Sequence, residues 1–352
     1  MEIQLKLKQE LKKKPEGELS FGAYFTDHMF VVDYTEGKGW HDPVIMPYEP
    51  IPMDPACCTL HYGQGIFEGM KAYYNKNGKI NLFRPMENFK RLNRSADKVC
   101  IPEIDPELAY QGLVKLLEVD KEWVPKKHGE SLYIRPFIVA TEPFLGIKPS
   151  RTYKFFIICS PVGAYYPGGL KPVKIMVEEH HVRAVVGGLG EAKTMANYAA
   201  SLLAGEKAKK LGYTQVLWLD GVEKKYIEEV GTMNIAFVIN GTFVTPSLDG
   251  SILAGITRDS VLKVMKHWGI PVEERRISIQ ELIQAGKDGS LTEIFGMGTA
   301  AVISPVSELK YKDEIIKVPE YSSDSLVMKV YDFITGVQYG DVEDTFGWTV
   351  EL

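Results

Sequence analysis

The sequence predicts a two-domain protein of the α/β (α+β) class. With 352 residues, the chain exceeds the size at which a single hydrophobic core stops growing. Short runs rich in β-branched and aromatic residues alternate with longer stretches of helical periodicity, and glycines and prolines concentrate in residues 163–172. We therefore expect a smaller N-terminal α/β domain over residues 1–164, an interdomain linker over 165–175 and a larger C-terminal domain over 176–352.

The elements of the N-terminal half follow from two kinds of pattern. Short runs dense in valine, isoleucine, phenylalanine and tyrosine predict strands, and amphipathic spacing of apolar residues predicts helices. The expected strands cover residues 28–34, 79–83, 131–139 and 153–159, and the expected helices cover 87–99 and 106–119.

In the C-terminal half, turn residues indicate where the expected helices and strands end. Residues 197–211 are rich in alanine, leucine and lysine and are followed by Gly212, which predicts one helix with a glycine stop. Asn240-Gly241 lies between two apolar runs and predicts a tight hairpin. The other expected strands are 173–178, 214–219, 235–239, 243–244 and 293–295, and the other expected helices are 257–268 and 278–284.

Composition and charge exclude several classes of protein. The chain is 45% apolar and 25% charged and carries a net charge of -5, which fits a globular protein that binds no nucleic acid. We expect no membrane association, because no apolar run is long enough to span a bilayer and residues 1–8 alternate polar with apolar side chains. Four irregularly spaced cysteines predict neither a disulfide framework nor a metal site, which favours a cytoplasmic location.

Lys193 is the best candidate nucleophile. It lies within VVGGLGEAKTMANY (residues 185–198), where most neighbours are small or apolar. A lysine in such surroundings is expected to be partly desolvated, and its neutral amine can attack a carbonyl carbon or form a Schiff base. The alternative interpretation is a solvated surface lysine.

Two glycine-threonine segments are candidate phosphate sites. Gly255-Ile256-Thr257 leads into an expected helix, and Gly298-Thr299-Ala300 follows an expected strand. Glycine lets the backbone approach an anion, and the threonine hydroxyl and nearby amides can bind phosphate oxygens. Each could instead be a helix cap without a ligand. Ahead of both segments, at an expected strand end, the carboxylates of Glu228 and Glu229 could hold a protonated ring nitrogen or could be surface acids.

A phosphate loop of a nucleotide hydrolase is a weaker alternative for Lys193-Thr194. The stretch from Gly187 to Thr194 is one substitution from that pattern. However, the loop needs glycine directly before the lysine and a buried strand ahead of it. The chain has Ala192 at the first position and EEHHVR (residues 178–183) at the second.

Taken together, these motifs resemble those of the branched-chain amino-acid aminotransferases, which are fold-type IV pyridoxal-phosphate enzymes. The resemblance extends over nearly the whole chain and requires several motifs in the right order. The motifs are HYGQGIFEGMKA (61–72), LFRP (82–85), YIRP (133–136), PVGAY (161–165), Lys193, EVGTMN (229–234), GIT (255–257) and GTA (298–300).

The resemblance implies a two-domain fold-type IV fold and a role for each cofactor residue. Lys193 would bind pyridoxal phosphate covalently, and Glu229 would pair with the ring nitrogen of the cofactor. Tyr198 would form a hydrogen bond with the phenolic oxygen of the cofactor. The phosphate would be bound by Arg91, Ile256, Thr257 and Thr299, and Arg183 would line the pocket.

The resemblance also implies substrate residues and a homodimer. Phe67 and Tyr165 would contact the substrate side chain, and Tyr62, Thr299 and Ala300 would meet the α-carboxylate. Tyr133 and Arg135 would serve the distal carboxylate of glutamate. Tyr62, Leu145 and Ile147 would come from the partner subunit. The chain has Ala301 and Ser304 where vertebrate members carry a redox-active cysteine pair, so thiol regulation is not expected there.

The implied activity is reversible ping-pong transfer of an amino group between leucine, isoleucine or valine and 2-oxoglutarate. The alternatives are D-amino-acid aminotransferase, aminodeoxychorismate lyase and a non-catalytic protein that binds pyridoxal phosphate. From the residues alone, the aromatic side chains could belong to the core, the arginines could form surface ion pairs, and Tyr198 could simply begin a helix.

Overall fold

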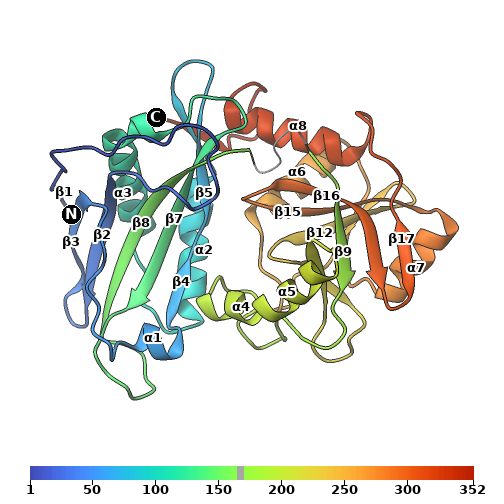
Figure 1. Ribbon diagram of the computed structural model, residues 1–352, viewed down its shortest axis with the longest axis horizontal. Coiled ribbons are helices and arrows are strands. Elements are labelled where there is room, and N and C mark those ends of the chain that lie inside the picture. Colours follow the sequence, from blue (N-terminus) through green and yellow to red (C-terminus); the bar gives the residue numbers. More distant parts are fainter. Residues whose placement is uncertain (165–169) are drawn as a thin grey trace. The chain divides into compact units, whose positions relative to one another are not determined.

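The computed structural model describes residues 1–164 and 170–352, and the chain divides into two compact units. Each unit contains a β-sheet and helices (Figure 1), so the mixed α/β class expected from the sequence is confirmed. The first unit consists of Met1–Tyr165, Ala192–Met195 and Gly336–Leu352, and the second consists of Tyr166–Glu191 and Ala196–Thr335.

The first unit is built on a mostly antiparallel sheet, which has nine strands in the described part of the chain. The strand order is β1-β3-β2-β8-β7-β5-β6-β18, and β4 pairs with β7 beside this path. The C-terminal strand pairs with β6, so the end of the chain returns to this unit. The strands are β1 Gln4–Leu5, β2 His28–Thr35, β3 Gly39–Pro47, β4 Gly65–Phe67, β5 Met70–Tyr74, β6 Ile80–Phe83, β7 Ser131–Ala140, β8 Thr152–Val162 and β18 Thr349–Glu351.

The helices of the first unit begin at residues that suit a helix start. Helices α2 and α3 each carry proline in the first turn, where its missing N–H costs no hydrogen bond. The side chain of Asp105 caps α3 by accepting a hydrogen bond of 3.0 Å from the Glu107 amide. The helices are α1 Cys58–Tyr62, α2 Pro85–Asp97, α3 Pro106–Val119 and the 3-10 helix η1 Lys121–Trp123.

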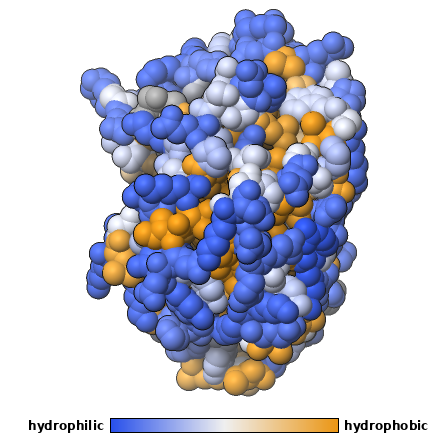
Figure 2. Space-filling model, turned by 90° about the vertical axis from the view of Figure 1, so that its right-hand side faces the viewer, coloured by the Kyte–Doolittle hydropathy of each residue, from blue (hydrophilic) through white to orange (hydrophobic). Residues whose placement is uncertain are grey.

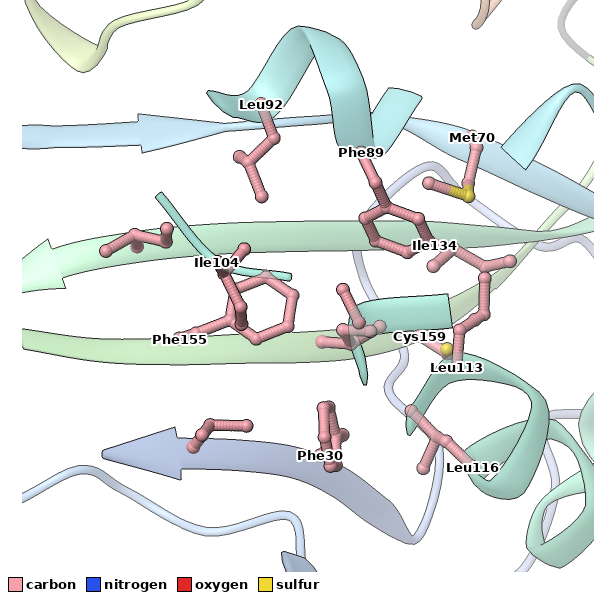
Figure 3. Close-up of a cluster of buried hydrophobic side chains, with 14 of the residues drawn as sticks. Phe30, Met70, Phe89, Leu92, Ile104, Leu113, Leu116, Ile134, Phe155 and Cys159 are labelled. Atoms are coloured by element: carbon pink, nitrogen blue, oxygen red, sulfur yellow. The ribbon is translucent and has the colours of Figure 1, made fainter. Parts of the chain in front are cut away.

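The core of the first unit lies between α2, α3 and one face of the sheet. Figure 3 shows Phe89 and Leu92 of α2 projecting toward Ile134 and Phe155 of the sheet, and all four are fully buried. Burial of one such side chain stabilises the fold by roughly 2 kcal/mol. Because side chains alternate along a strand, Tyr133 and Arg135 of β7 lie on the opposite face from Ile134.

The second unit contains a mixed sheet, which also has nine strands in the described residues. Its order is β11-β10-β9-β16-β15-β12-β13-β14, with β17 paired to β16. Strand β9 runs parallel to both of its neighbours, β10 and β16. The strands are β9 Val173–Val177, β10 Gln215–Leu219, β11 Ile227–Val230, β12 Asn234–Ile239, β13 Thr242–Thr245, β14 Val272–Glu274, β15 Leu291–Gly298, β16 Val302–Tyr311 and β17 Glu314–Lys317.

The helices of the second unit cover an apolar core of sheet residues. Ala204 and Ala208 of α5 pack with Val216 and Trp218 of β10, and all four are buried. Ile279 and Leu282 of α7 belong to the main core of the unit. The helices are α4 Met195–Ala200, which begins at the unit boundary, α5 Leu202–Lys210, α6 Ile256–His267, α7 Ile279–Asp288 and α8 Leu326–Tyr339, which crosses into the first unit.

The surface agrees with the composition of the chain. Hydrophilic side chains cover most of the face in Figure 2, and hydrophobic side chains gather in smaller areas. Among the described residues, no helix combines the length and the apolar character needed to cross a bilayer.

Most elements expected from the sequence are present. The helix expected at 106–119 matches α3, and the Asn240-Gly241 turn joins β12 to β13 with positive φ values of 50° and 75°. The single helix expected at 197–211 is wrong, because the chain forms α4 and α5 with a break at Ser201. The Ser201 hydroxyl donates a 2.8 Å hydrogen bond to the Tyr198 carbonyl and so competes with the helical hydrogen bonds.

The division of the chain differs from the expected domain boundaries in two places. Residues 192–195 and 336–352 belong to the first unit, although both lie within the C-terminal domain expected from the sequence. Pairing with distant strands explains this: Thr194 bridges to Ile66, and β18 pairs with β6. Residues 165–169 of the expected linker lie outside the described residues.

Candidate active site

The backbone on both sides of Lys193 is held by the first unit. The Lys193 amide donates a 2.9 Å hydrogen bond to the hydroxyl of Ser95 on α2. Its carbonyl accepts a 3.1 Å hydrogen bond from the Phe67 amide at the end of β4. The next residue, Thr194, forms a β-bridge with Ile66. The lysine is therefore fixed between a helix and a strand.

The side chain of Lys193 lies over an aromatic ring. Its Nζ atom is 4.8 Å from the centroid of the Phe67 ring, within range of a cation–π interaction. A partly apolar surrounding of this kind was the sequence-based reason to single out the lysine.

Arg91 lies in α2 and forms a buried ion pair with Glu68. Its Nε and Nη2 atoms donate hydrogen bonds of 2.7 and 2.8 Å to the two carboxylate oxygens. Arg91 is 5% exposed and Glu68 is fully buried. Burial raises the pKa of Glu68, but the charge and hydrogen bonds of Arg91, the charge of Lys193 and the Asn88 amide outweigh it and hold the pKa below its usual value.

Tyr133 and Arg135 lie together on the face of β7 that points away from the helices. Arg135 Nη2 donates a 3.0 Å hydrogen bond to the Tyr133 hydroxyl, and the guanidinium lies 4.7 Å from the Phe67 ring centroid. The structure thus brings together three residues predicted to contact substrate. Among the described residues, Arg135 Nε and the hydroxyl of Ser160 are buried without a hydrogen-bond partner. Ser160 is the β8 neighbour of Tyr133 in the sheet register.

Tyr62, Leu145 and Ile147 occupy an exposed part of the first unit. The Tyr62 hydroxyl donates a hydrogen bond to the Leu145 carbonyl, which joins the end of α1 to the loop after β7. The three side chains are 45%, 59% and 87% exposed, respectively. The structure therefore places all three residues at the surface of the first unit.

In the second unit, Glu229 is held by a set of polar contacts. Its Oε1 atom accepts hydrogen bonds from the Leu253 amide at 2.9 Å and the Asn234 side chain at 3.3 Å. Arg183 Nε lies 3.1 Å from Glu229 Oε2, which is ion-pair distance. The angle does not suit a hydrogen bond, so this buried Nε has no hydrogen-bond partner among the described residues.

Glu228 points to the other side of β11. Its Oε1 atom accepts a 2.5 Å hydrogen bond from Ser251, and it lines a cavity of about 310 Å³ together with Asp220 and Tyr226. Burial raises the pKa of Glu228, and the nearby charges of Glu229 and Asp220 add to the rise, while Ser251 and Arg183 oppose it. The two glutamates that the sequence left as alternatives are therefore separated by strand alternation.

The two expected phosphate segments converge on Asn234. Gly255 precedes α6, and a Cβ atom at this glycine would lie only 1.9 Å from Asn234 Oδ1. Asn234 also pairs in register with Met297 of β15, which directly precedes residues 298–300 at the turn into β16. Asn234 therefore links Glu229, the start of α6 and this turn. Asn234 was expected only as the last residue of the EVGTMN motif, with no role of its own. Its position as a polar residue at the end of the motif that contains Glu229 and Gly231 was the only sequence signal for such a role.

The start of α6 presents backbone donors. Gly255 is extended at the N-cap, no side chain caps it, and Ile256 and Thr257 form the first turn. The first amides of a helix carry partial positive charge and suit an anion. Tyr198 lies in α4 and is half-buried. Tyr165 lies outside the described residues.

Comparison with known proteins identifies the family. Residues 65–309 match the model of the amino-transferase class IV family. The chain belongs to this family. A relative from Bacillus subtilis, branched-chain-amino-acid aminotransferase 2, is 58% identical over 351 residues, which cover 99% of this chain and 97% of the relative. The branched-chain-amino-acid aminotransferase of Mycolicibacterium smegmatis is 47% identical over 337 residues, which cover 94% of this chain and 92% of the relative.

Solved structures of class IV aminotransferases share the fold. The crystal structure of the Escherichia coli branched-chain amino acid aminotransferase matches with a TM-score of 0.76 and 27% identity over 92% of this chain and 98% of that chain. The branched-chain aminotransferase of Thermoproteus uzoniensis, solved with norvaline, gives a TM-score of 0.76 and 25% identity over 92% of this chain and 99% of that chain. The aminotransferase fold expected from the sequence is therefore confirmed.

Proposed function

We propose that the protein transfers the amino group of leucine, isoleucine or valine to 2-oxoglutarate, reversibly and with pyridoxal phosphate as cofactor. The branched-chain aminotransferases that resemble it at 58% and 47% identity match nearly its whole length. The observation that carries the proposal is Lys193, whose backbone is fixed on both sides and whose amine lies over Phe67.

The residues present fit pyridoxal phosphate. An aldehyde needs a lysine amine, a pyridinium nitrogen needs a carboxylate, and a phosphate needs amides, hydroxyls and cations. Lys193, Glu229 and the start of α6 with Ile256 and Thr257 supply these groups. The buried Arg183 Nε and Thr194 hydroxyl, which lack hydrogen-bond partners among the described residues, fit a ligand that brings further polar atoms. Tyr198, Arg91 and Thr299 complete the proposed set.

The chain's own residues account for binding and proton transfer. When bound, the cofactor supplies an electron sink for the negative charge that develops at the substrate Cα. The Lys193 amine would take the Cα proton as general base and deliver it to the former aldehyde carbon of the cofactor. Glu229, fixed by Leu253 and Asn234, keeps the ring nitrogen protonated.

Substrate recognition is divided between apolar and polar groups. Phe67 and Tyr165 would contact a branched side chain. Tyr133 and Arg135 would bind the distal carboxylate of glutamate, because an arginine with a phenol hydroxyl offers a charge-assisted donor pair. Tyr62 and the amides of Thr299 and Ala300 would bind the α-carboxylate.

We also propose that two copies of the chain form the active enzyme. Leu145 and Ile147 expose apolar side chains beside Tyr62, and a second copy would cover them. A cytoplasmic location is supported by the cysteines, since Cys57, Cys58, Cys100 and Cys159 are all free thiols.

The visible spectrum of the purified protein before and after addition of L-leucine tests this function. We expect absorbance of a lysine-bound cofactor that changes with L-leucine and returns with 2-oxoglutarate. Borohydride reduction followed by peptide mapping should place the cofactor on Lys193. A response to D-alanine instead would indicate the D-amino-acid enzyme, and bound cofactor without any response would indicate a non-catalytic binder.

A further inference from the structure

Glu68 is a buried carboxylate to which the reaction gives no direct role. It follows β4 and accepts four hydrogen bonds: Arg91 Nε at 2.7 Å, Arg91 Nη2 at 2.8 Å, Asn88 Nδ2 at 2.8 Å and the Gly69 amide at 3.2 Å. A fully buried carboxylate is costly to place in a protein unless it is paired in this way. The four hydrogen bonds therefore indicate that the Glu68 carboxylate has a specific role in this part of the structure.

The partners of Glu68 share one face of α2 with the residue that holds Lys193. Asn88, Arg91 and Ser95 are spaced i, i+3 and i+7, which places them on one side of a helix. Asn88 and Arg91 contact Glu68, and Ser95 accepts the hydrogen bond from the Lys193 amide. On the strand side, Phe67 binds the Lys193 carbonyl and directly precedes Glu68.

The ion pair limits the orientations open to Arg91. A guanidinium is planar and has five N–H groups, and the fork with Glu68 engages two of them along one edge. With Nε and Nη2 both bound, the plane and the direction of the remaining edge are set. Without the carboxylate, the positive charges of Arg91 and Lys193 would also lack their shared negative neighbour.

We propose that Glu68 is a positioning residue that holds the Arg91 guanidinium in the orientation in which it binds the phosphate of the cofactor. The inference rests on the proposed function, because it assumes that Arg91 binds this phosphate. Glu68 itself does not touch the cofactor; it acts through Arg91.

Two vitamers separate this role from a general structural role. Pyridoxal phosphate and pyridoxal share the aldehyde and the ring, and only the first carries the phosphate. The dissociation constants of both are measured by titration of cofactor-free protein for the wild type, Glu68→Gln, Arg91→Gln and the double variant. Loss of a charge-assisted hydrogen-bond pair predicts that Glu68→Gln weakens pyridoxal phosphate binding about 10- to 100-fold more than pyridoxal binding, because any effect of the lost charge on Lys193 is common to both vitamers.

The matched control is Asp120→Asn. Asp120 is also buried in the first unit, and both of its carboxylate oxygens bind one residue, His28, at 2.7 and 3.0 Å. We expect this variant to lower the melting temperature without changing the ratio of the two dissociation constants. Glu68→Asp keeps the charge but shortens the side chain, so its ratio of the two dissociation constants should lie between those of the wild type and Glu68→Gln. This variant replaces Glu68→Gln in the test if the glutamine variant does not fold.

The outcomes distinguish the inference from the function on which it rests. If Glu68 acts through Arg91, adding Glu68→Gln to Arg91→Gln should cause little further loss. Equal weakening of both vitamers, or full additivity in the double variant, would overturn the positioning role while the wild type still binds cofactor. A wild-type protein that binds neither vitamer would overturn the proposed function itself.

Discussion

At the scale of single residues, Lys193 shows how backbone contacts prepare a side chain for chemistry. Its amide and carbonyl are both bound, to Ser95 and Phe67, so the amine extends from a fixed point. Lys193→Ala should therefore abolish turnover, with a loss of at least about 10²- to 10⁴-fold, while the fold is retained. Stopped-flow spectra with L-leucine measure the half-reaction directly. Transamination near the wild-type rate would rule out this lysine.

The adjacent glutamates of β11 give a paired test. Glu229→Gln removes the charge that Leu253 and Asn234 orient, and we expect the half-reaction with L-leucine to lose most of its rate. Glu228→Gln is the matched control, because Glu228 lies on the other face of the strand with Ser251. Its rate should stay within about threefold of wild type. The reverse result would show that Glu228 holds the ring.

Lys71 of β5 predicts a pH dependence of stability. Burial lowers its pKa from 10.5 to about 8. The unfolded chain therefore binds more protons than the folded one between about pH 8 and 10.5, so stability rises with pH in this window. Lys71→Met should raise the free energy of unfolding at pH 7, by up to about 3 kcal/mol, and the gain should shrink toward pH 10. Urea denaturation of both proteins at pH 7 and pH 9.5 measures the difference, and a constant gain would contradict the prediction.

At the scale of single residues, the sequence indicated what each functional group could do but not what it contacts. Lys193 stood out by its neighbours in the chain, whereas Glu229 was distinguished from Glu228 only by the family resemblance. The fork between Arg91 and Glu68 did not stand out, because the two are 23 residues apart and meet only when α2 packs against the end of β4. The link from Asn234 to Gly255 likewise depends on a tertiary contact.

At the scale of elements, local pattern predicted the strands and helices whose own residues carry the signal. Residues 131–139 read as a strand and form β7. Strand β16, Val302–Tyr311, was not among the expected strands. Pro305 does not prevent its pairing and lies opposite Phe295 of β15, just as Pro136 lies within the expected strand β7.

Gly69, which directly precedes β5, lies against the Tyr133 side chain of β7, and this close contact predicts the effect of a substitution. A Cβ atom at this position would lie 2.2 Å from the Tyr133 hydroxyl, so Gly69→Ala must displace Tyr133 from Arg135. We expect KM for 2-oxoglutarate to rise roughly tenfold while KM for leucine changes less. The control is Gly205→Ala in α5, where nothing lies within 4 Å. That change should stabilise the protein by about 0.5–1 kcal/mol and leave KM unaffected. An unchanged KM in Gly69→Ala would disconnect Tyr133 from the distal carboxylate.

At the scale of the whole molecule, the proposed homodimer depends on exposed apolar side chains. Ile147→Lys places a charge on a side chain that is 87% exposed and that a second copy would bury. We expect the mass measured by light scattering to shift from dimer toward monomer and activity to fall with it. Val222→Lys, at 84% exposure in the second unit, is the control and should remain dimeric. A dimer of unchanged stability in Ile147→Lys would place the interface elsewhere.

The two-unit division also shows where sequence pattern reaches its limit. Composition placed the expected linker at residues 165–175, because glycine and proline cluster there. It could not assign residues 192–195 or 336–352, since their membership is decided by pairing with strands more than a hundred residues away.

Because residues 192–195 and 336–352 return to the first unit, the protein cannot be divided near residue 175 into two complete halves. A polypeptide that ends near residue 175 would contain most of the first unit, but it would lack residues 192–195, which include Lys193, and the edge strand β18. Without β18, the backbone of β6 would be unpaired on one side. Such a fragment would be prone to aggregate. A polypeptide beginning at residue 176 would carry both missing pieces without the sheet that receives them. The two halves are therefore expected to recover activity only when they are produced together.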